Sequence, residues 1–404
     1  MKILLLNDMS TPLGGAEIYC LQLRKLLREA GHEARFLSSN VGAKDLRQAD
    51  LEFKSAKNRV TNRLLQTYNP FSARALRKEL DRFQPDVVHL HLFLNHLSPS
   101  VLRPLRAVPT VHTEHTYQSI CLTGRRMLPN GAPCAERYGK ACLSNRCLPA
   151  PLWAVDMLQR WILNRQQHAI DLRLTVSHHS QDLIGAFAAH TPLLQRCFST
   201  RPVAEVPFPK APPTVCFIGR LVAKKGVDQL INAFAAAKAS VPDARLLIAG
   251  TGPEDATLRR LTVSLGLTKA ISFLGHVHND DHDTVYRQAH FQVVPSLWPE
   301  PFGIVAQEAH SAGRAVIATH GGALAETVRD NETGYLVAPD DTEALADRLA
   351  KMLSDPESCR RMGARALAIQ AKAPTNDALL EQHVTHYRRA IEAFAVQSGF
   401  SRSY

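Results

Sequence analysis

The chain has 404 residues, which is long for one domain and sufficient for two domains of about 200 residues each. Hydrophobic residues make up 45% and charged residues 21%, a composition typical of globular proteins that excludes a fibrous or disordered chain. No apolar run approaches the roughly 18 residues of a membrane-spanning helix, and the short apolar start ends at Asn7-Asp8. We therefore expect a cytoplasmic protein without a signal peptide or membrane span.

The formal net charge of +11 belongs entirely to the first half of the chain. Residues 1–200 contain 26 Lys and Arg against 15 Asp and Glu, whereas residues 201–404 contain 22 of each. Basic residues interleaved with hydrophobic ones between 44 and 82 suit peripheral contact with anionic lipid, or an ordinary solvated helix face. No nucleic-acid-binding motif accompanies them, so nucleic acid is not an expected partner. They are Lys44, Arg47, Lys54, Lys57, Arg59, Arg63, Arg74, Arg77, Lys78 and Arg82.

Short apolar strands alternate with helical patterns along the first half, which predicts a parallel sheet with crossover helices. A helix over 16–30 follows the first strand and ends before Gly31. Its expected buried stripe is Ile18, Leu21, Leu26 and Leu27. The expected strands are residues 2–6, 34–38, 86–91, 110–112 and 172–177.

Four of the eight cysteines, Cys121, Cys134, Cys142 and Cys147, lie in or beside a loop-like segment, 124–151. The paired Cys-x-x-Cys spacing typical of zinc sites is missing, so zinc, a local disulfide and free thiols all stay open. None of the predicted site residues is expected to bind a metal ion. The other four cysteines are scattered and expected to be reduced and buried.

Five prolines between 202 and 213 predict an inter-domain linker over 201–213. The alternation then restarts, so the sequence predicts an α/β fold of two Rossmann-like domains, 1–200 and 214–380, with doubly wound parallel sheets facing a central cleft. A C-terminal helix is expected at 381–404, and packing of this helix against the first domain is one possible arrangement. Strands are expected at 215–219, 245–250, 271–273, 291–295 and 315–318, and helices at 227–240, 303–312, 342–354 and about 377–396.

One glycine-containing segment follows the first strand of each half. Gly14 and Gly15 precede the first helix, where free amides and close backbone approach suit a phosphate, although a plain tight turn is equally compatible. Gly219 is followed by Arg220 and Lys225, two cations that can neutralise a diphosphate at the carboxyl end of a strand. Each motif is weak when taken alone.

Residues 295–309 are the most informative stretch. Glu300 falls in a proline-bounded loop, and Glu308 lies about a turn and a half into the following helix. Carboxylates accept hydrogen bonds from sugar hydroxyls, and the amides of Phe302, Gly303 and Ile304 sit where a helix N-terminus offers donors to an anion. The acid/base pair of a glycosidase is the competing use of two carboxylates.

This stretch, Pro-Ser-Leu-Trp-Pro-Glu-Pro-Phe-Gly followed by Glu308-Ala309, resembles the signature of the retaining glycosyltransferases of family 4, which adopt the two-domain GT-B fold. Further segments agree in the expected order and extend the resemblance over nearly the whole chain. They are Gly14-Gly15-Ala16-Glu17, Pro85-Asp86-Val87-Val88-His89-Leu90-His91, His112, Gly219-Arg220 with Lys225-Gly226, Gly250-Thr251-Gly252-Pro253, Phe273-Leu274-Gly275-His276-Val277, Gly321-Gly322 with Glu326, and Gly334-Tyr335-Leu336-Val337.

The resemblance implies roles for the acidic residues and their neighbours in binding a UDP- or GDP-sugar. Glu300 would bind hydroxyls of the donor sugar, and the backbone of Phe302, Gly303 and Ile304 would hold the same sugar and the phosphate. Glu308 would bind the ribose hydroxyls, and the backbone around Val277 would meet the base.

The resemblance assigns the charge stabilisation to cations rather than to a metal, so no cofactor is expected. Arg220 and Lys225 would stabilise the diphosphate leaving group, helped by the amides of Gly14 and Gly15. His112 would project toward the donor sugar. The transferred hexose would keep its anomeric configuration, and the acceptor would be a glycan, polysaccharide or lipid-linked carbohydrate.

Several positions depart from the family pattern. Residues 197–200 read Cys-Phe-Ser-Thr where an Asn-Gly-x-Asp segment is common in the family. The contact that the family makes through that segment is therefore in doubt for this chain. Ala289-His290 replaces a common Ala-Asp. The segment from His112 to His115 resembles a subset with a longer acceptor-side loop, which makes His115 a second candidate.

Two other functions remain as alternatives. A glycoside hydrolase or phosphorylase on the same fold would use Glu300 as an acid. A non-catalytic nucleotide-sugar or membrane-surface binding module would need no cations for a leaving group.

Overall fold

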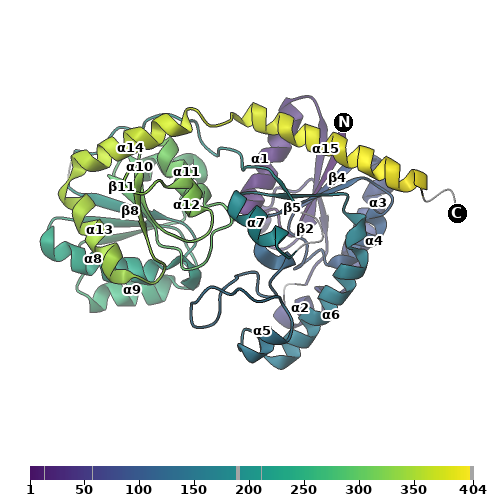
Figure 1. Cartoon of the computed structure of the whole chain (residues 1–404), viewed down its shortest axis with the longest axis horizontal. Coiled ribbons are helices and arrows are strands. Elements are labelled where there is room, and N and C mark those ends of the chain that lie inside the picture. Colours follow the sequence, from purple (N-terminus) through teal and green to yellow (C-terminus); the bar gives the residue numbers. More distant parts are fainter. Residues whose placement is uncertain (13, 57, 188–191, 211, 401–404) are drawn as a thin grey trace. The chain divides into compact units, whose positions relative to one another are not determined.

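The computed structural model describes residues 1–12, 14–56, 58–187, 192–210 and 212–400. The chain forms two compact units (Figure 1). Unit 1 comprises Met1–Pro129, Cys134–Phe198 and Pro374–Tyr404, and unit 2 comprises Asn130–Pro133 and Ser199–Ala373. Of the basic residues singled out above, Lys57 and the side chain of Arg59 lie outside the described part.

Unit 1 is built on a seven-stranded parallel sheet in the order β3-β2-β1-β4-β5-β6-β7. Strand β1, which lies between β2 and β4, is buried from its second residue onward because both faces of the sheet are covered. The two outermost strands, β3 and β7, were not expected from the sequence. The strands are β1 Lys2–Asn7, β2 Glu33–Ser39, β3 Leu51–Phe53, β4 Val87–Leu90, β5 Thr110–Glu114, β6 Leu172–Thr175 and β7 Leu193–Leu194.

The helices of unit 1 include α6, a 17-residue helix that the sequence analysis did not predict. Helix α3 begins at a proline, and the side chain of Asn69 caps it by accepting from the amides of Phe71 and Ser72. The helices are α1 Gly15–Glu29, α2 Arg59–Leu65, α3 Pro70–Phe83, α4 Leu102–Leu105, α5 Lys140–Ser144, α6 Ala150–Gln166 and α7 His178–Gly185.

The C-terminal helix α15, Asn376–Phe400, belongs to unit 1, where it packs against α1 and β5. Tyr19 of α1 hydrogen-bonds His383 at 2.5 Å, and His89 of β4 hydrogen-bonds Tyr387 at 2.9 Å. This packing changes the buried face of α1. Only Leu27 of the four expected core residues is fully buried, because the buried stripe runs through Tyr19, Cys20, Leu23 and Leu27.

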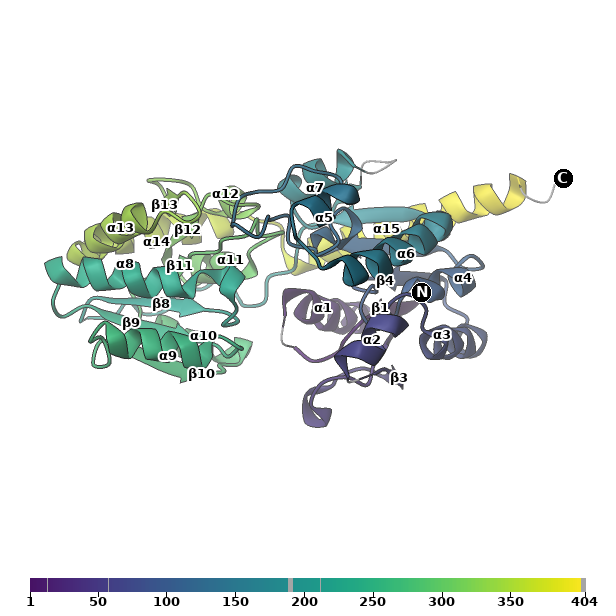
Figure 2. The ribbon, with the colours of Figure 1, turned by 90° about the horizontal axis from the view of Figure 1, so that it is seen from below.

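Unit 2 contains a six-stranded parallel sheet in the order β10-β9-β8-β11-β12-β13. Two hydrophobic clusters cover its two faces: α8, α9 and α13 contribute to one, and α10, α11 and α12 to the other (Figure 2). The expected α/β class with doubly wound parallel sheets is thus confirmed. The strands are β8 Thr214–Ile218, β9 Arg245–Ala249, β10 Ile271–Gly275, β11 Phe291–Val294, β12 Ala315–Thr319 and β13 Gly334–Val337.

The helices of unit 2 have short loops between them and the strands. The bounds expected for two of them, 227–240 and 342–354, match the structure. The helices are α8 Val227–Ser240, α9 Asp255–Ser264, α10 His282–Tyr286, α11 Ile304–Ser311, α12 Leu324–Thr327, α13 Thr342–Ser354 and α14 Pro356–Gln370.

The proline-rich segment expected as a linker lies within unit 2. The amides of Ala204 and Val206 donate to the carbonyls of Ser311 and Ala312 at 3.1 Å each. The buried guanidinium of Arg314 donates to the carbonyls of Val206 and Pro207. Repeated prolines prevent regular structure here, but these contacts hold the segment against unit 2. Residue 211 lies outside the described part.

No helix in the described ranges is both long and apolar enough to cross a membrane.

Candidate functional site

Three loops at the carboxyl ends of the strands in unit 2 meet around Glu300. The loop after β8 contacts the loop after β11, where the amide of Leu297 donates to the carbonyl of Lys224 at 2.9 Å. The segment after β12 closes the other side, because the amide of Ala323 donates to the carbonyl of Glu300 at 2.8 Å. Carboxyl ends of neighbouring parallel strands are the usual ligand-binding edge of such a sheet.

Glycines permit these close contacts between loops. Gly226 has φ 65°, and a Cβ there would lie 2.1 Å from the carbonyl oxygen of Pro295. Gly322 has φ 68°, and a Cβ would lie 2.2 Å from the carbonyl oxygen of Glu300. Any larger residue at either position would push the Glu300 loop away.

The Glu300 carboxylate is 5% exposed and accepts hydrogen bonds from three donors at Oε1. These are Lys225 Nζ at 2.6 Å, Ser296 Oγ at 2.5 Å and Trp298 Nε1 at 2.8 Å. Burial pushes the pKa of Glu300 upward, but the Lys225 charge and the three hydrogen bonds outweigh burial and lower it. The side chain is therefore a carboxylate near neutral pH.

The two predicted cations occupy different surroundings. Lys225 is half-buried and ion-paired with Glu300, so the expected diphosphate ligand and the expected sugar ligand are direct neighbours. Arg220 is exposed just beyond β8, where the amide of Gly219 donates to the carbonyl of Ala249 at 2.9 Å. The neighbouring Lys224 lies over the Trp298 ring, with Nζ 3.3 Å from the ring centroid.

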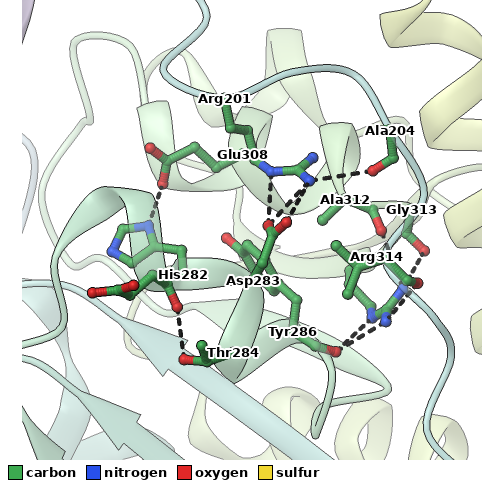
Figure 3. A network of polar contacts seen from close by, with 12 residues as sticks. Arg201, Ala204, His282, Asp283, Thr284, Tyr286, Glu308, Ala312, Gly313 and Arg314 are labelled. Atoms are coloured by element: carbon green, nitrogen blue, oxygen red, sulfur yellow. Dashed lines mark hydrogen bonds and ion pairs between the residues drawn. The ribbon is translucent and has the colours of Figure 1, made fainter.

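Helix α11 begins at Ile304, one residue after Gly303, which has φ 82°. Phe302, Gly303 and Ile304 thus lie at the start of the helix, as expected. Their amides follow the Glu300 loop directly in the chain. Glu308 is 4% exposed, one turn further along α11. It contacts His282 of α10, whose Nδ1 lies 3.1 Å from Glu308 Oε2 (Figure 3).

Val277 is the remaining candidate of unit 2. It follows β10, is half-buried and packs against the cluster that contains α10 and α11. Its segment precedes α10, which carries His282.

In unit 1, Gly14 forms the N-cap of α1 and Gly15 is its first residue. A Cβ on Gly14 would lie 2.5 Å from a carboxylate oxygen of Glu17. The nearby hydroxyls of Ser10 and Thr11 are buried and have no hydrogen-bond partner within the described part of the chain. The start of α1, which follows β1, is therefore polar.

His112 lies within β5 of unit 1 and His115 directly follows that strand, and both line a partly open pocket with His91, Glu114 and Arg173. His112 Nδ1 lies 3.8 Å from Glu114 Oε1, which also pairs with Arg173 at 2.9 Å. His115 Nε2 contacts His91 Nδ1 at 2.9 Å. Burial lowers the pKa of His112 to about 4 and that of His115 to about 3, so both imidazoles are neutral at physiological pH.

The four clustered cysteines are free thiols in the structure, as are Cys20, Cys197, Cys216 and Cys359. Cys121 and Cys142 are buried, and Cys134 and Cys147 are partly exposed. Among the described residues, no group of three or more His, Cys, Asp or Glu side chains is arranged to hold a metal ion. The structure therefore gives no support to the zinc option left open above.

Four side chains that contact Glu300 or Glu308 were not assigned a role from the sequence: Ser296, Trp298, Thr200 and His282. Ser296 and Trp298 hold Glu300, and Thr200 and His282 hold Glu308. Thr200 stands in the segment where this chain departs from the family pattern. That departure was a signal by which Thr200 could have been found. No sequence feature marked His282.

Two Rossmann-like units, with glycine-bounded strand ends carrying paired cations and carboxylates, define the GT-B class of nucleotide-sugar-dependent transferases. The family described as Glycosyl transferases group 1 matches residues 201–368, and Glycosyltransferase Family 4 matches residues 13–190. The chain is 31% identical to the D-inositol 3-phosphate glycosyltransferase of Nocardia farcinica, over 78% of this chain and 70% of that protein. The chain belongs to glycosyltransferase family 4 and is a glycosyltransferase of the GT-B type.

Solved structures share this fold. Sucrose-phosphate synthase of Thermosynechococcus elongatus superposes with a TM-score of 0.72 at 23% identity, covering 97% of this chain and 100% of that one. Anabaena HepE in complex with UDP-glucose gives 0.68 at 20% identity, covering 96% and 99%. WaaG, a glycosyltransferase involved in lipopolysaccharide biosynthesis, gives 0.70 at 15% identity, covering 94% and 98%.

Proposed function

We propose that this chain transfers a hexose-type sugar from a UDP- or GDP-sugar to an acceptor hydroxyl with retention of the anomeric configuration, in glycan, polysaccharide or glycolipid biosynthesis. The solved complex of Anabaena HepE with UDP-glucose favours testing uridine donors first. Glu300 binds the sugar hydroxyls, Lys225 and Arg220 stabilise the diphosphate, and Glu308 binds the ribose. Gly14, Gly15 and His112 of unit 1 keep the roles that the resemblance implies.

The observation that carries this proposal is the set of donors around Glu300. A general acid must hold a proton, whereas Lys225, Ser296 and Trp298 all stabilise the ionised form of this side chain and lower its pKa. This arrangement favours a carboxylate that accepts sugar hydroxyls over the protonated acid of a glycoside hydrolase or phosphorylase.

Charge stabilisation by side chains makes a metal cofactor unnecessary in this proposal. The leaving diphosphate gains negative charge as the glycosidic bond breaks, and a Lys225 ammonium beside it stabilises that charge in the transition state. Retention follows when the acceptor hydroxyl attacks on the face that the diphosphate leaves, with a donor phosphate oxygen taking its proton. Activity is then expected to survive chelation by EDTA.

We further propose peripheral contact of unit 1 with anionic membrane at the inner face. Leu64 of α2 and Tyr68 and Phe71 around the start of α3 are at least half exposed. Arg74, Arg77, Lys78 and Arg82 follow along α3 and line a shallow surface depression with Asp81. Exposed apolar side chains beside cations suit the interfacial region of an anionic bilayer.

A donor screen followed by product analysis tests the proposed function. UDP- and GDP-hexoses are compared by thermal shift, since a ligand of the folded state raises its melting temperature. The best donor is then incubated with an acceptor panel, and the anomeric configuration of the product is determined by NMR. Free sugar released without regard to acceptor would indicate a hydrolase, and tight binding without transfer to any acceptor would indicate a binding module.

A further inference from the structure

The buried carboxylate of Glu308 is held by two side chains from other segments of unit 2. Thr200 Oγ1 donates to Glu308 Oε1. His282 Nδ1 lies 3.1 Å from Glu308 Oε2 (Figure 3). A carboxylate only accepts hydrogen bonds, so the ring nitrogen of His282 that faces it carries the hydrogen. Each carboxylate oxygen therefore has one fixed donor.

The same two segments are joined a second time, one residue further along each. Arg201 follows Thr200 and Asp283 follows His282, and Arg201 Nε donates to Asp283 Oδ1 at 3.1 Å (Figure 3). Arg201 also donates to the carbonyl of Ala204. The direct contact of Arg201 with Asp283, together with the contacts of both donors with Glu308, fixes the segments that carry Thr200 and His282.

The partners of Glu308 differ in kind from those of Glu300. Glu300 is paired with the Lys225 ammonium, whereas the cation nearest in sequence to Thr200, Arg201, is engaged by Asp283. A hydroxyl and an imidazole N–H orient Glu308 while leaving each oxygen able to accept another hydrogen bond. Two such free positions on one carboxylate match the two neighbouring hydroxyls of a ribose.

On the basis of the proposed function, we infer that Thr200 and His282 are positioning residues that aim Glu308 at both ribose hydroxyls, which makes the site selective for ribonucleotides over deoxyribonucleotides. Thr200 stands in the segment where the Asn-Gly-x-Asp pattern of the family is missing. In this chain the threonine hydroxyl there serves the ribose-binding carboxylate.

Binding of UDP, 2′-deoxy-UDP and 3′-deoxy-UDP to the full chain, measured by calorimetry, tests this inference. Wild type is expected to bind UDP at least tenfold more tightly than either deoxy compound, because the site is left with an unmatched buried acceptor. Thr200→Val and His282→Ala should each weaken UDP binding about fivefold to tenfold and reduce the preference for UDP. In transfer assays the same variants should raise the donor KM more than they lower kcat.

Matched variants separate positioning from folding. His282→Asn keeps an N–H donor and should retain part of the preference for UDP, with a melting temperature close to that of His282→Ala. Thr284→Val, on the exposed side of α10, and His168→Ala, exposed in unit 1, should leave the preference unchanged. GDP and 2′-deoxy-GDP replace the uridine compounds if the donor screen selects guanine.

The outcomes distinguish this inference from the proposed function. If wild type binds neither UDP nor GDP, the proposed function fails. If wild type prefers UDP and Glu308→Gln abolishes that preference while Thr200→Val and His282→Ala keep it in full, the proposed function stands and the positioning inference is overturned.

Discussion

At the residue scale, the pair of Glu300 and Lys225 brings together the proposed ligand for the sugar and the proposed ligand for the leaving group. Their 2.6 Å contact joins residues that are 75 positions apart in the sequence. Glu300 Oε1 takes all three donors given above, from Lys225, Ser296 and Trp298. The pair thus keeps the carboxylate ionised and fixed in direction.

Replacing this carboxylate by an amide tests its charge at nearly constant shape. We expect Glu300→Gln to lower kcat by about 10²–10³, because an amide accepts hydroxyl hydrogen bonds less strongly and leaves the Lys225 charge without its partner. Nucleotide release in the presence of acceptor measures the rate. Glu357→Gln, on the surface of α14, is the control and should keep full activity, and equal activity of the two variants would contradict the role of Glu300.

At the element scale, Arg314 joins the segment 204–207 to the ends of α10 and α11. Its guanidinium is completely buried and donates to carbonyls at Val206, Pro207, Tyr286, Ala289 and Ala312. Figure 3 shows Arg314 beside Tyr286 and Ala312. Burial is the largest influence on its pKa and lowers it to about 10, so the side chain remains charged at neutral pH. A charged group that donates hydrogen bonds to this many carbonyl oxygens stabilises the segment 204–207, α10 and α11 together.

Arg314→Met should lower the free energy of unfolding by about 3–5 kcal/mol, because several buried carbonyl oxygens lose their donors at once. Urea denaturation followed by circular dichroism measures the change. Arg361→Met, at an exposed position of α14, is the matched control and should shift the midpoint little. A shift as small for Arg314→Met as for the control would show that the segment is held by other contacts.

Buried histidines tie α15 to the sheet of unit 1. His383 on α15 hydrogen-bonds Tyr19, and the tilted rings of His89 and His91 lie with their centroids 4.0 Å apart. Burial first, and neighbouring histidines second, lower the pKa values of His89, His91 and His383 well below 6.5. Protonating any of them would place a charge in an apolar interior.

These histidines predict acid destabilisation of unit 1. A lowered folded-state pKa means that the unfolded chain binds more protons, so stability is complete above about pH 6.5 and falls as the pH drops toward the folded-state value. For His112, with a pKa of about 4, the loss approaches 3 kcal/mol. Burial raises the pKa of Asp171 to about 6 and also raises that of Asp156, so these two carboxyl groups act in the opposite direction but are outnumbered by the buried histidines.

Thermal melts at pH 7.5, 6 and 5 measure this dependence. The melting temperature should be nearly constant down to pH 6.5 and fall below it. A melting temperature that is equal at pH 7.5 and pH 5 would contradict the burial of neutral histidines.

The elements that the sequence predicted well are those with a continuous apolar run between turn residues. Strands β1, β8 and β12 are of this kind, because both faces of each sheet are covered. The edge strand β7 has two half-buried residues and too few for a pattern, and α6 has no clear apolar stripe. Periodicity therefore located the core of each sheet and missed its margins.

The candidate residues came from motifs, but their partners did not. No local rule places Lys225 on Glu300 or His282 on Glu308, because these contacts arise where loops from different strands meet. Trp298 belongs to the signature stretch, but only the structure shows that its indole N–H donates to Glu300.

At the scale of the whole molecule, the net positive charge belongs to the first half of the sequence. The surplus of 11 basic residues lies in residues 1–200, and many of them precede or belong to α3. This distribution is the basis of the proposed contact of unit 1 with anionic membrane.

We predict salt-sensitive binding of the chain to vesicles that contain anionic phosphatidylserine, because cations near the bilayer contribute about 1 kcal/mol each at low salt. Co-sedimentation at low and high salt measures it. Replacing Arg74, Arg77 and Lys78 by Gln should weaken binding, whereas Arg360→Gln and Arg361→Gln on α14 should not. Equal binding to neutral phosphatidylcholine vesicles, or none at low salt, would refute the membrane contact.

A crystal structure of the chain with an intact nucleotide-sugar, chosen by the donor screen, tests the account most directly. We predict the diphosphate beside Lys225 and Arg220, a sugar hydroxyl on Glu300 and the ribose hydroxyls on Glu308. A donor bound in full occupancy away from these four side chains would contradict the account.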